Sequence, residues 1–182
     1  MSALATTDAL FFDSLDRAAA EALLARATQG CEDGELFLEY RESEAIFLDD
    51  GRIRSASYDT TRGFGLRAVS GDAAGYAHAA ELSEAALARA ADAVGAVRSG
   101  HSGVLDVGPR ATNARLYSDA NPLNELPFGD KTALLERIDA YARARDSRVV
   151  QVSASLIGSW SVVEIIRADG HRVRDVRPLA HA

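Results

Sequence analysis

The dipeptide Asp50-Gly51 lies between two runs of strand-forming residues, and it constrains the fold more than any other feature of the sequence. Asp-Gly is a preferred sequence for the two-residue turn of a β-hairpin, because that turn requires positive φ angles. Four glycines in the following run indicate turns, bulges or close backbone approaches: Gly63, Gly65, Gly71 and Gly75. The sequence therefore predicts short consecutive strands joined by tight turns.

Three segments carry apolar residues at helical spacing and predict helices near 14–28, 84–98 and 130–146. Asp13 or Ser14, then Ser83 and Asp130, are the expected N-caps, and Gly30 is expected to end the first helix. Strands are expected at 35–41, 44–50, 52–58, 63–70, 74–80, 148–157, 160–168 and 171–177. Hairpins predominate, so the predicted class is α+β with an antiparallel, hairpin-rich sheet.

The chain divides into two halves around residues 99–129, which hold three of the four prolines and predict an irregular surface loop or linker. Residues 1–98 form the first helix-plus-sheet half, and residues 130–182 form the second, helix-plus-hairpin half. The order helix, strand, strand, Asp-Gly and basic strand occurs in both halves. Either an internal αββ duplication or two unrelated helix-plus-hairpin segments explains this similarity.

Composition narrows the protein class and the compartment. The net charge of −7 gives no electrostatic basis for binding nucleic acid or an anionic membrane. A single cysteine, Cys31, cannot form an internal disulfide and fits a reducing compartment. The N-terminus lacks the basic and apolar regions of a signal peptide, and no apolar run is long enough to cross a bilayer. These features predict a cytoplasmic protein.

No motif in the sequence predicts a self-contained catalytic or metal site. The four histidines, at 78, 101, 171 and 181, include no pair at the i, i+4 spacing of a helical metal motif. Cys31 has no evident His partner and is interpreted as an incidental thiol. Gly63-Phe64-Gly65 begins like a dinucleotide loop but lacks the third glycine and the following helix.

Arg67 and Tyr76 are the two candidate binding residues. Arg67 lies in an otherwise apolar strand, so it either faces solvent or faces a cleft and binds a carboxylate or a backbone carbonyl. Tyr76 lies between Gly75 and Ala77, which leaves room for another backbone to approach. Ordinary cross-strand packing is the alternative for Tyr76.

In the order of these segments, the chain resembles the TldD/PmbA family. The resemblance rests on residues 50–77, the helix after Ser83, residues 146–155 and residues 169–178. It covers nearly the whole chain and lies in ordered pattern rather than in one sharp motif. The family's His-Glu-x-x-x-His element and distant zinc-ligand cysteine match no position here, so the resemblance assigns no catalytic or metal residue.

The resemblance implies an N-terminal segment of a cytoplasmic zinc peptidase system that acts on unfolded or modified peptides. This segment is expected to bind no zinc, and a non-catalytic partner subunit or interaction module of the PmbA type is the alternative. Expected partners are a peptide substrate and a second chain, in a homo-oligomer or a heterodimer with a related subunit. Arg67 and Tyr76 are the residues expected to face them.

Family members continue beyond Pro178, so the chain is expected to be a fragment with an open edge at the last strand, 171–177. Val162, Ile166 and Val173 are then expected to be only partly covered. Alternating arginines, Arg172, Arg174 and Arg177, would partly protect this edge. Self-association is the predicted consequence.

Overall fold

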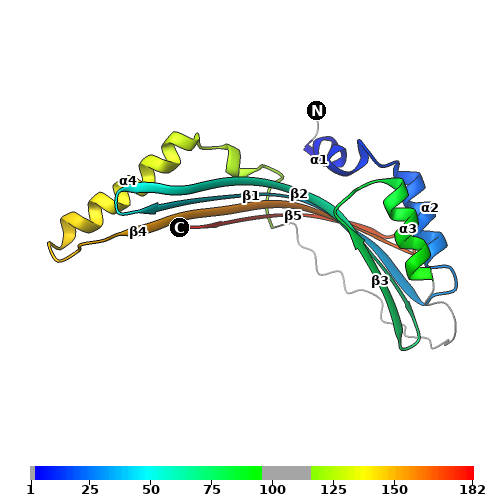
Figure 1. The fold of residues 1–182 in the computed structure, drawn as a ribbon. Coiled ribbons are helices and arrows are strands. Elements are labelled where there is room, and N and C mark those ends of the chain that lie inside the picture. The colour runs from blue at the N-terminus through cyan, green and yellow to red at the C-terminus, as the bar shows by residue number, and fades with distance from the viewer. Residues whose placement is uncertain (1–2, 96–115) are drawn as a thin grey trace. The chain divides into compact units, whose positions relative to one another are not determined.

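The computed structural model describes residues 3–95 and 116–182 (Figure 1). The described helices are α1 (Ala3–Phe12), α2 (Arg17–Ala27), α3 (Glu84–Gly95), the 3₁₀-helix η2 (Pro122–Asn124) and α4 (Phe128–Arg145). The described strands are β1 (Asp33–Asp49), β2 (Arg52–Ser70), β3 (Ala73–Ala79), β4 (Ser153–Arg167) and β5 (Arg172–His181).

The described strands form one five-stranded sheet in the order β3-β2-β1-β4-β5. β2 and β3 pair antiparallel, with Ser70 opposite Ala73 at the turn. β1 and β4 are also antiparallel. The amide of Ala168, just after the end of β4, donates to the carbonyl of Gly34 near the start of β1. At the other end, the amide of Asp50, just after β1, donates to the carbonyl of Val152, just before β4, and both bonds measure 2.9 Å. The predicted α+β class with an antiparallel sheet is confirmed.

The turn at Asp50-Gly51 connects β1 to β2 as the sequence predicts. Both residues have positive φ, 51° and 73° respectively, as a type I′ hairpin turn requires. The second Asp-Gly turn, between β4 and β5, has a different backbone, since only Gly170 is in the left-handed region there (φ 84°). The two turns therefore differ in conformation, and the internal duplication stays a prediction.

Three strands are longer than predicted, because each of β1, β2 and β4 passes through a position where the sequence suggested a break. The break predicted in β2 covers residues 59–62. They lie in a stretch, 54–62, in which every residue is exposed, so no alternation of buried and exposed residues marks them as strand. Residues 148–152, predicted to begin a strand, precede β4, and the amide of Val149 closes a turn onto the carbonyl of Asp146. The predicted eight strands are therefore wrong in number.

The side-chain phase of β2 changes along its length. Ile53 packs with Ile46 and Leu48, which places an odd-numbered residue of β2 on the face of even-numbered residues of β1. Further along, Arg67 bonds Asp33 and Glu35, so odd-numbered residues share a face. Such a change of phase between paired strands requires an odd number of extra residues, as in a β-bulge.

The three predicted helices are present: α3 starts at residue 84 as predicted, α2 and α4 start at other residues than predicted, and α1 was not predicted. The carboxylate of Asp16, rather than Asp13 or Ser14, caps α2 by accepting from the amide of Ala19. Ser83 caps α3 as predicted, because its hydroxyl accepts a hydrogen bond from the amide of Ala86 at 3.2 Å. Asp130 lies in the first turn of α4, and Pro127 occupies the N-cap position.

The described residues fall into two compact units that interleave along the chain. Unit 1 contains the described residues of 1–40, 61–119 and 162–175, and unit 2 contains those of 41–60, 120–161 and 176–182. In unit 1, α3 packs against α2 and β3 (Figure 1). Leu36, Leu66 and Ile166 are buried strand residues of unit 1, and Leu24 and Leu87 are buried helix residues. Val162 and Ile166 were expected to be partly covered, but both are fully buried.

The smaller core of unit 2 lies between α4 and the strands. Ile46, Leu48 and Leu135 form it, and Ile53, Ala154 and Leu156 pack at its margin.

None of the described helices is both long and apolar enough to span a membrane. The predicted loop covers residues 99–129, and its part up to residue 115 lies outside the described residues. The predicted boundaries of the two halves, at residues 98 and 130, therefore stay predictions.

Candidate functional site

In unit 1, the odd-numbered residues of β1 and β2 share the face that Arg67 occupies, and we call it the open face. The β2–β3 register adds Tyr76, opposite Arg67, and His78, opposite Gly65. Tyr76 and His78 are both exposed. On the other face, the even-numbered Glu164 and Arg172 contact α2 through ion pairs, so that face is covered by helix.

Arg67 lies within a group of alternating charges on the open face. Its Nε donates to Glu35 and its Nη2 to Asp33, each at 3.0 Å, and Arg167 of β4 donates to the other Asp33 oxygen at 2.6 Å. Partial burial opposes the charge of Arg67, but hydrogen bonds and Coulombic attraction from Glu35 and Asp33 outweigh it and raise the pKa of Arg67. Arg67 therefore binds carboxylates of its own chain.

Tyr76 packs across the sheet and also remains accessible. Its side chain is 66% exposed, and its ring lies 5.7 Å from the ring of His78. A Cβ built at Gly65 would lie 2.7 Å from the hydroxyl oxygen of Tyr76, so the tyrosine extends over the glycine. A larger residue at position 65 would require the exposed Tyr76 side chain to move. Roles for Arg67 and Tyr76 in binding a peptide or a partner stay predictions.

A groove of about 310 Å³ lies beside Tyr76 on unit 1, and we call it the glycine groove. Gly63 and Gly65 of β2 lie between Phe37 and Glu39 of β1 and the side chains of β3. A Cβ at Gly63 would lie 2.5 Å from the carbonyl oxygen of Ala79, so no other residue fits that position without a shift of backbone. Two successive positions of the open face of β2 therefore have no side chain.

The two edges of the described sheet differ in chemistry. β3 contains no Asp, Glu, Lys, Arg or Pro over Ala73–Ala79. β5, in contrast, contains three arginines, one aspartate and Pro178. Charged residues and proline normally protect edge strands from pairing with other chains. β5 is therefore the protected edge, and β3 is the edge whose sequence permits another strand to pair.

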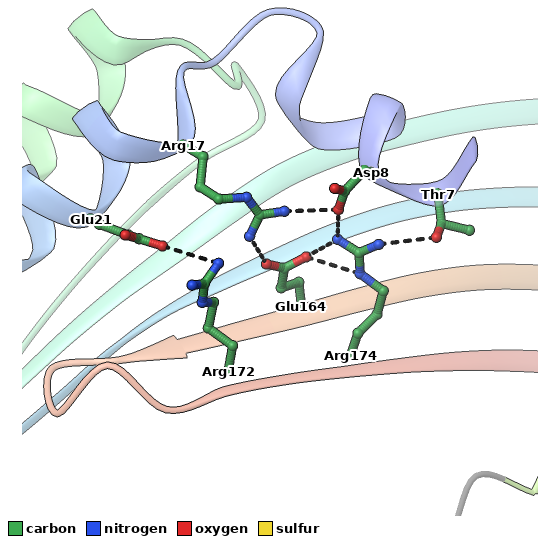
Figure 2. Close-up of polar contacts among 7 residues, drawn as sticks. All are labelled: Thr7, Asp8, Arg17, Glu21, Glu164, Arg172 and Arg174. Atoms are coloured by element: carbon green, nitrogen blue, oxygen red, sulfur yellow. Dashed lines mark hydrogen bonds and ion pairs between the residues drawn. The ribbon is translucent and has the colours of Figure 1, made fainter. Parts of the chain in front are cut away.

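The arginines of β5 do not extend freely from the edge, because a buried glutamate holds one of them (Figure 2). Glu164 is 3% exposed and accepts from Arg17 of α2 at 2.5 Å and from Nε of Arg174 at 2.9 Å. Arg174 also donates to Asp8 and Thr7 of α1. Figure 2 shows this network joining both helices to β4 and β5 on the covered face.

Arg172 of β5 also forms an ion pair with Glu21 of α2, at 3.4 Å. Burial alone would lower the pKa of Arg174, but its hydrogen bonds to Glu164 and Asp8 outweigh that effect and raise it. The sequence did not predict this network, because residues 8, 17, 164 and 174 are brought together only by the fold. A glutamate between Val163 and Ile165 in a buried strand was the one available signal.

We predict that this network makes stability depend on acid pH through Asp8. Burial tends to raise the pKa of Asp8, but Arg174 and Arg17 outweigh it and lower the pKa below its ordinary value of 3.8. A carboxyl with a lowered folded-state pKa stabilises the fold above its unfolded pKa, and this contribution is lost as pH falls through the folded pKa. In denaturant titrations from pH 6 to about pH 2, Asp8→Asn should lose less stability than the parent. An identical decrease in both proteins would contradict this assignment.

Unit 2 has its own buried ion pair, on the strand-facing side of α4. The buried residues of this helix are Lys131, Leu135 and Asp139. Nζ of Lys131 donates to Glu44 of β1 and to the carbonyl of Leu123 at 2.6 Å. α4 therefore docks largely through polar side chains, and Ile138 and Tyr141 remain 38% and 68% exposed.

The described His, Cys, Asp and Glu side chains are not arranged as a zinc site. In the part of the chain that the structure describes, no group of three or more His, Cys, Asp and Glu side chains is placed to hold a metal ion. His78 lies beside Tyr76, and Cys31 is a free thiol near the end of α2.

Comparison with known proteins matches the chain to two consecutive domain models of one family. Residues 34–98 match the PmbA/TldA metallopeptidase domain 1, and residues 121–182 match the PmbA/TldA metallopeptidase central domain. A metalloprotease TldD homologue of Haemophilus influenzae is 38% identical over 149 residues, which is 80% of this chain and 31% of that protein. A TldD homologue of Buchnera aphidicola is 30% identical over 154 residues, or 84% of this chain and 32% of that protein.

A solved structure has the same fold. TldE from Thermococcus kodakarensis superposes with a TM-score of 0.70 at 15% identity, over 89% of this chain and 37% of that chain. This chain thus spans about a third of the length of the relatives that it matches. By its two domain matches and its curated relatives, the chain belongs to the PmbA/TldD metallopeptidase family.

Proposed function

We propose that this segment receives an extended peptide at the edge of β3 and performs no hydrolysis itself. The observation that carries the proposal is the contrast between the uncharged, proline-free β3 and the arginine-rich β5. An extended peptide that pairs with a sheet edge gains main-chain hydrogen bonds, and pockets for alternate side chains give specificity. In the full-length system, the hydrolytic step and its zinc would belong to residues outside this segment.

The register identifies which backbone groups of β3 are available. Ser70 and Ala73 close a two-residue turn, so they form a hydrogen-bonded pair. Because hydrogen-bonded and non-hydrogen-bonded pairs alternate, Ala74, Tyr76 and His78 direct their N–H and C=O groups away from β2. The side chains of Tyr76 and His78 lie on the open face, beside the glycine groove.

We expect the replacement of His78 by proline to weaken peptide binding more than its replacement by alanine. Both variants lose the imidazole, but only His78→Pro loses the outward N–H and places a ring at the edge. The affinity of His78→Pro should be about tenfold below that of His78→Ala, as expected for one hydrogen bond and a blocked edge. Fluorescence anisotropy with a labelled peptide of about ten alternating valines and serines, containing one lysine, measures this difference.

Equal affinities of the two variants, with both folded by circular dichroism, would refute pairing at β3.

A second candidate occupant of this edge is a related subunit or a second copy of the chain, as the resemblance to two-subunit systems implies. Analytical ultracentrifugation distinguishes the two occupants. The subunit would be favoured if the chain dimerises, if His78→Pro abolishes the dimer and if the peptide does not compete with dimerisation. That result would overturn the peptide proposal. The cytoplasmic location remains part of this proposal.

A further inference from the structure

We propose that the glycine groove is a subsite for one cationic side chain of the bound peptide and that Glu39 selects it. This inference rests on the proposed function, since it names the side-chain preference of the peptide at β3. The groove is lined on one side by Glu39 and Phe37 and on the other by Tyr76 and His78.

Glu39 differs from the other acidic residues of the same strand and face. Asp33 and Glu35 are each paired with Arg67. Glu39 is partly buried, and no described residue donates to its carboxylate or forms an ion pair with it. Arg62, which also borders the groove, is exposed and forms no ion pair with Glu39. Among the residues that line the groove, Glu39 is the only carboxylate, and it is not paired with Arg62, so a cationic ligand would form an ion pair there.

The glycines provide a path from the sheet edge to this carboxylate. Neighbouring strands lie about 4.8 Å apart, so β1 is about 10 Å from β3 across β2. β2 has no side chain at positions 63 and 65, and the Tyr76 side chain, which extends over Gly65, forms one wall of this path. A lysine or arginine side chain can place its apolar stem along the Tyr76 ring and its charged group at Glu39.

The aromatic side chains of the groove favour the same occupant. Phe37 and Tyr76 present apolar ring surface to an aliphatic stem, and aromatic faces attract cations. A carboxylate in the same position would meet Glu39 and be repelled. The chemical class that fits the groove is therefore an extended peptide with lysine or arginine at the position over Gly63 and Gly65, rather than an acidic or wholly apolar one.

Three labelled peptides that differ only at one central position, with lysine, norleucine or glutamate, test the proposal against the 182-residue chain. We expect the lysine peptide to bind about tenfold more tightly than the norleucine peptide, as for a hydrogen bond to a charged group, and the glutamate peptide to bind most weakly. Glu39→Gln should reduce the lysine preference to about twofold or less.

Asp72→Asn is the matched control, because it removes one exposed carboxylate from the β2–β3 turn, outside the groove. This variant should keep the full preference for lysine. Equal binding of lysine and norleucine peptides by the parent chain, or a preference that survives Glu39→Gln, would overturn the subsite and leave pairing at β3 intact. Failure of all three peptides to bind would instead overturn the proposed function itself.

Discussion

Replacing Glu164 with glutamine should lower the free energy of unfolding by about 3–5 kcal/mol, the range for removal of one partner from a buried ion pair. Glu164 is 3% exposed and accepts from both Arg17 and Arg174 (Figure 2). Once residue 164 has lost its negative charge, Arg174 would still have Asp8 and Thr7 as partners. Arg17 would keep only Asp8 among the residues of this network. Chemical denaturation followed by circular dichroism measures the loss.

Glu136→Gln is the control for that variant, because Glu136 is exposed on α4. A surface substitution of this kind should change stability by no more than about 0.5 kcal/mol. If Glu164→Gln were as stable as Glu136→Gln, the network would not hold α1 and α2 to the strands of unit 1 in the way described.

The second large effect is expected at Lys131, the only lysine of the chain. Lys131→Met should destabilise the protein by about 3 kcal/mol, because Glu44 would then lie in the α4 interface without its cation. Because Lys131→Met/Glu44→Met removes both charges, it should recover part of that loss. Arg137→Met, on the exposed side of the same helix, should have little effect.

Amine labelling gives an independent measurement of the same contact. The side chain of Lys131 is 7% exposed, so an amine-reactive reagent should modify the folded chain at its N-terminal amine and label Lys131 only after unfolding. Rapid labelling of Lys131 under native conditions would show that α4 does not dock through this residue. Such a result would contradict the predicted stability loss as well.

Local sequence signals predicted the features that depend on neighbouring residues. Asp50-Gly51 requires a left-handed backbone, and Ser83 precedes a helix whose first amides need an acceptor, so both are local constraints. Residues 59–62 of β2 could not be recognised as strand, because they belong to an exposed stretch that buries neither face and lacks alternation. Its pairing with β1 maintains the strand, and no property of its own sequence indicates that pairing.

Long-range contacts explain what the sequence could not predict about the candidate site. Arg67 was recognised as unusual, but its partners Asp33 and Glu35 lie more than thirty residues away. The absence of any partner for Glu39 among the described residues becomes apparent only when the neighbouring strands are in place. The glycines of the groove were recognised as close-approach positions, which the backbone of Ala79 confirms for Gly63.

Amide hydrogen exchange on β3, measured residue by residue by NMR with and without the lysine-containing probe peptide, shows directly whether the peptide pairs with this edge. We expect Ala74, Tyr76 and His78, whose amides face away from β2, to become protected when peptide binds. Amides of Ala77 and Ala79, which face β2, should change little. Binding that leaves the three outward amides unprotected, or that protects β5 instead, would contradict peptide pairing at β3.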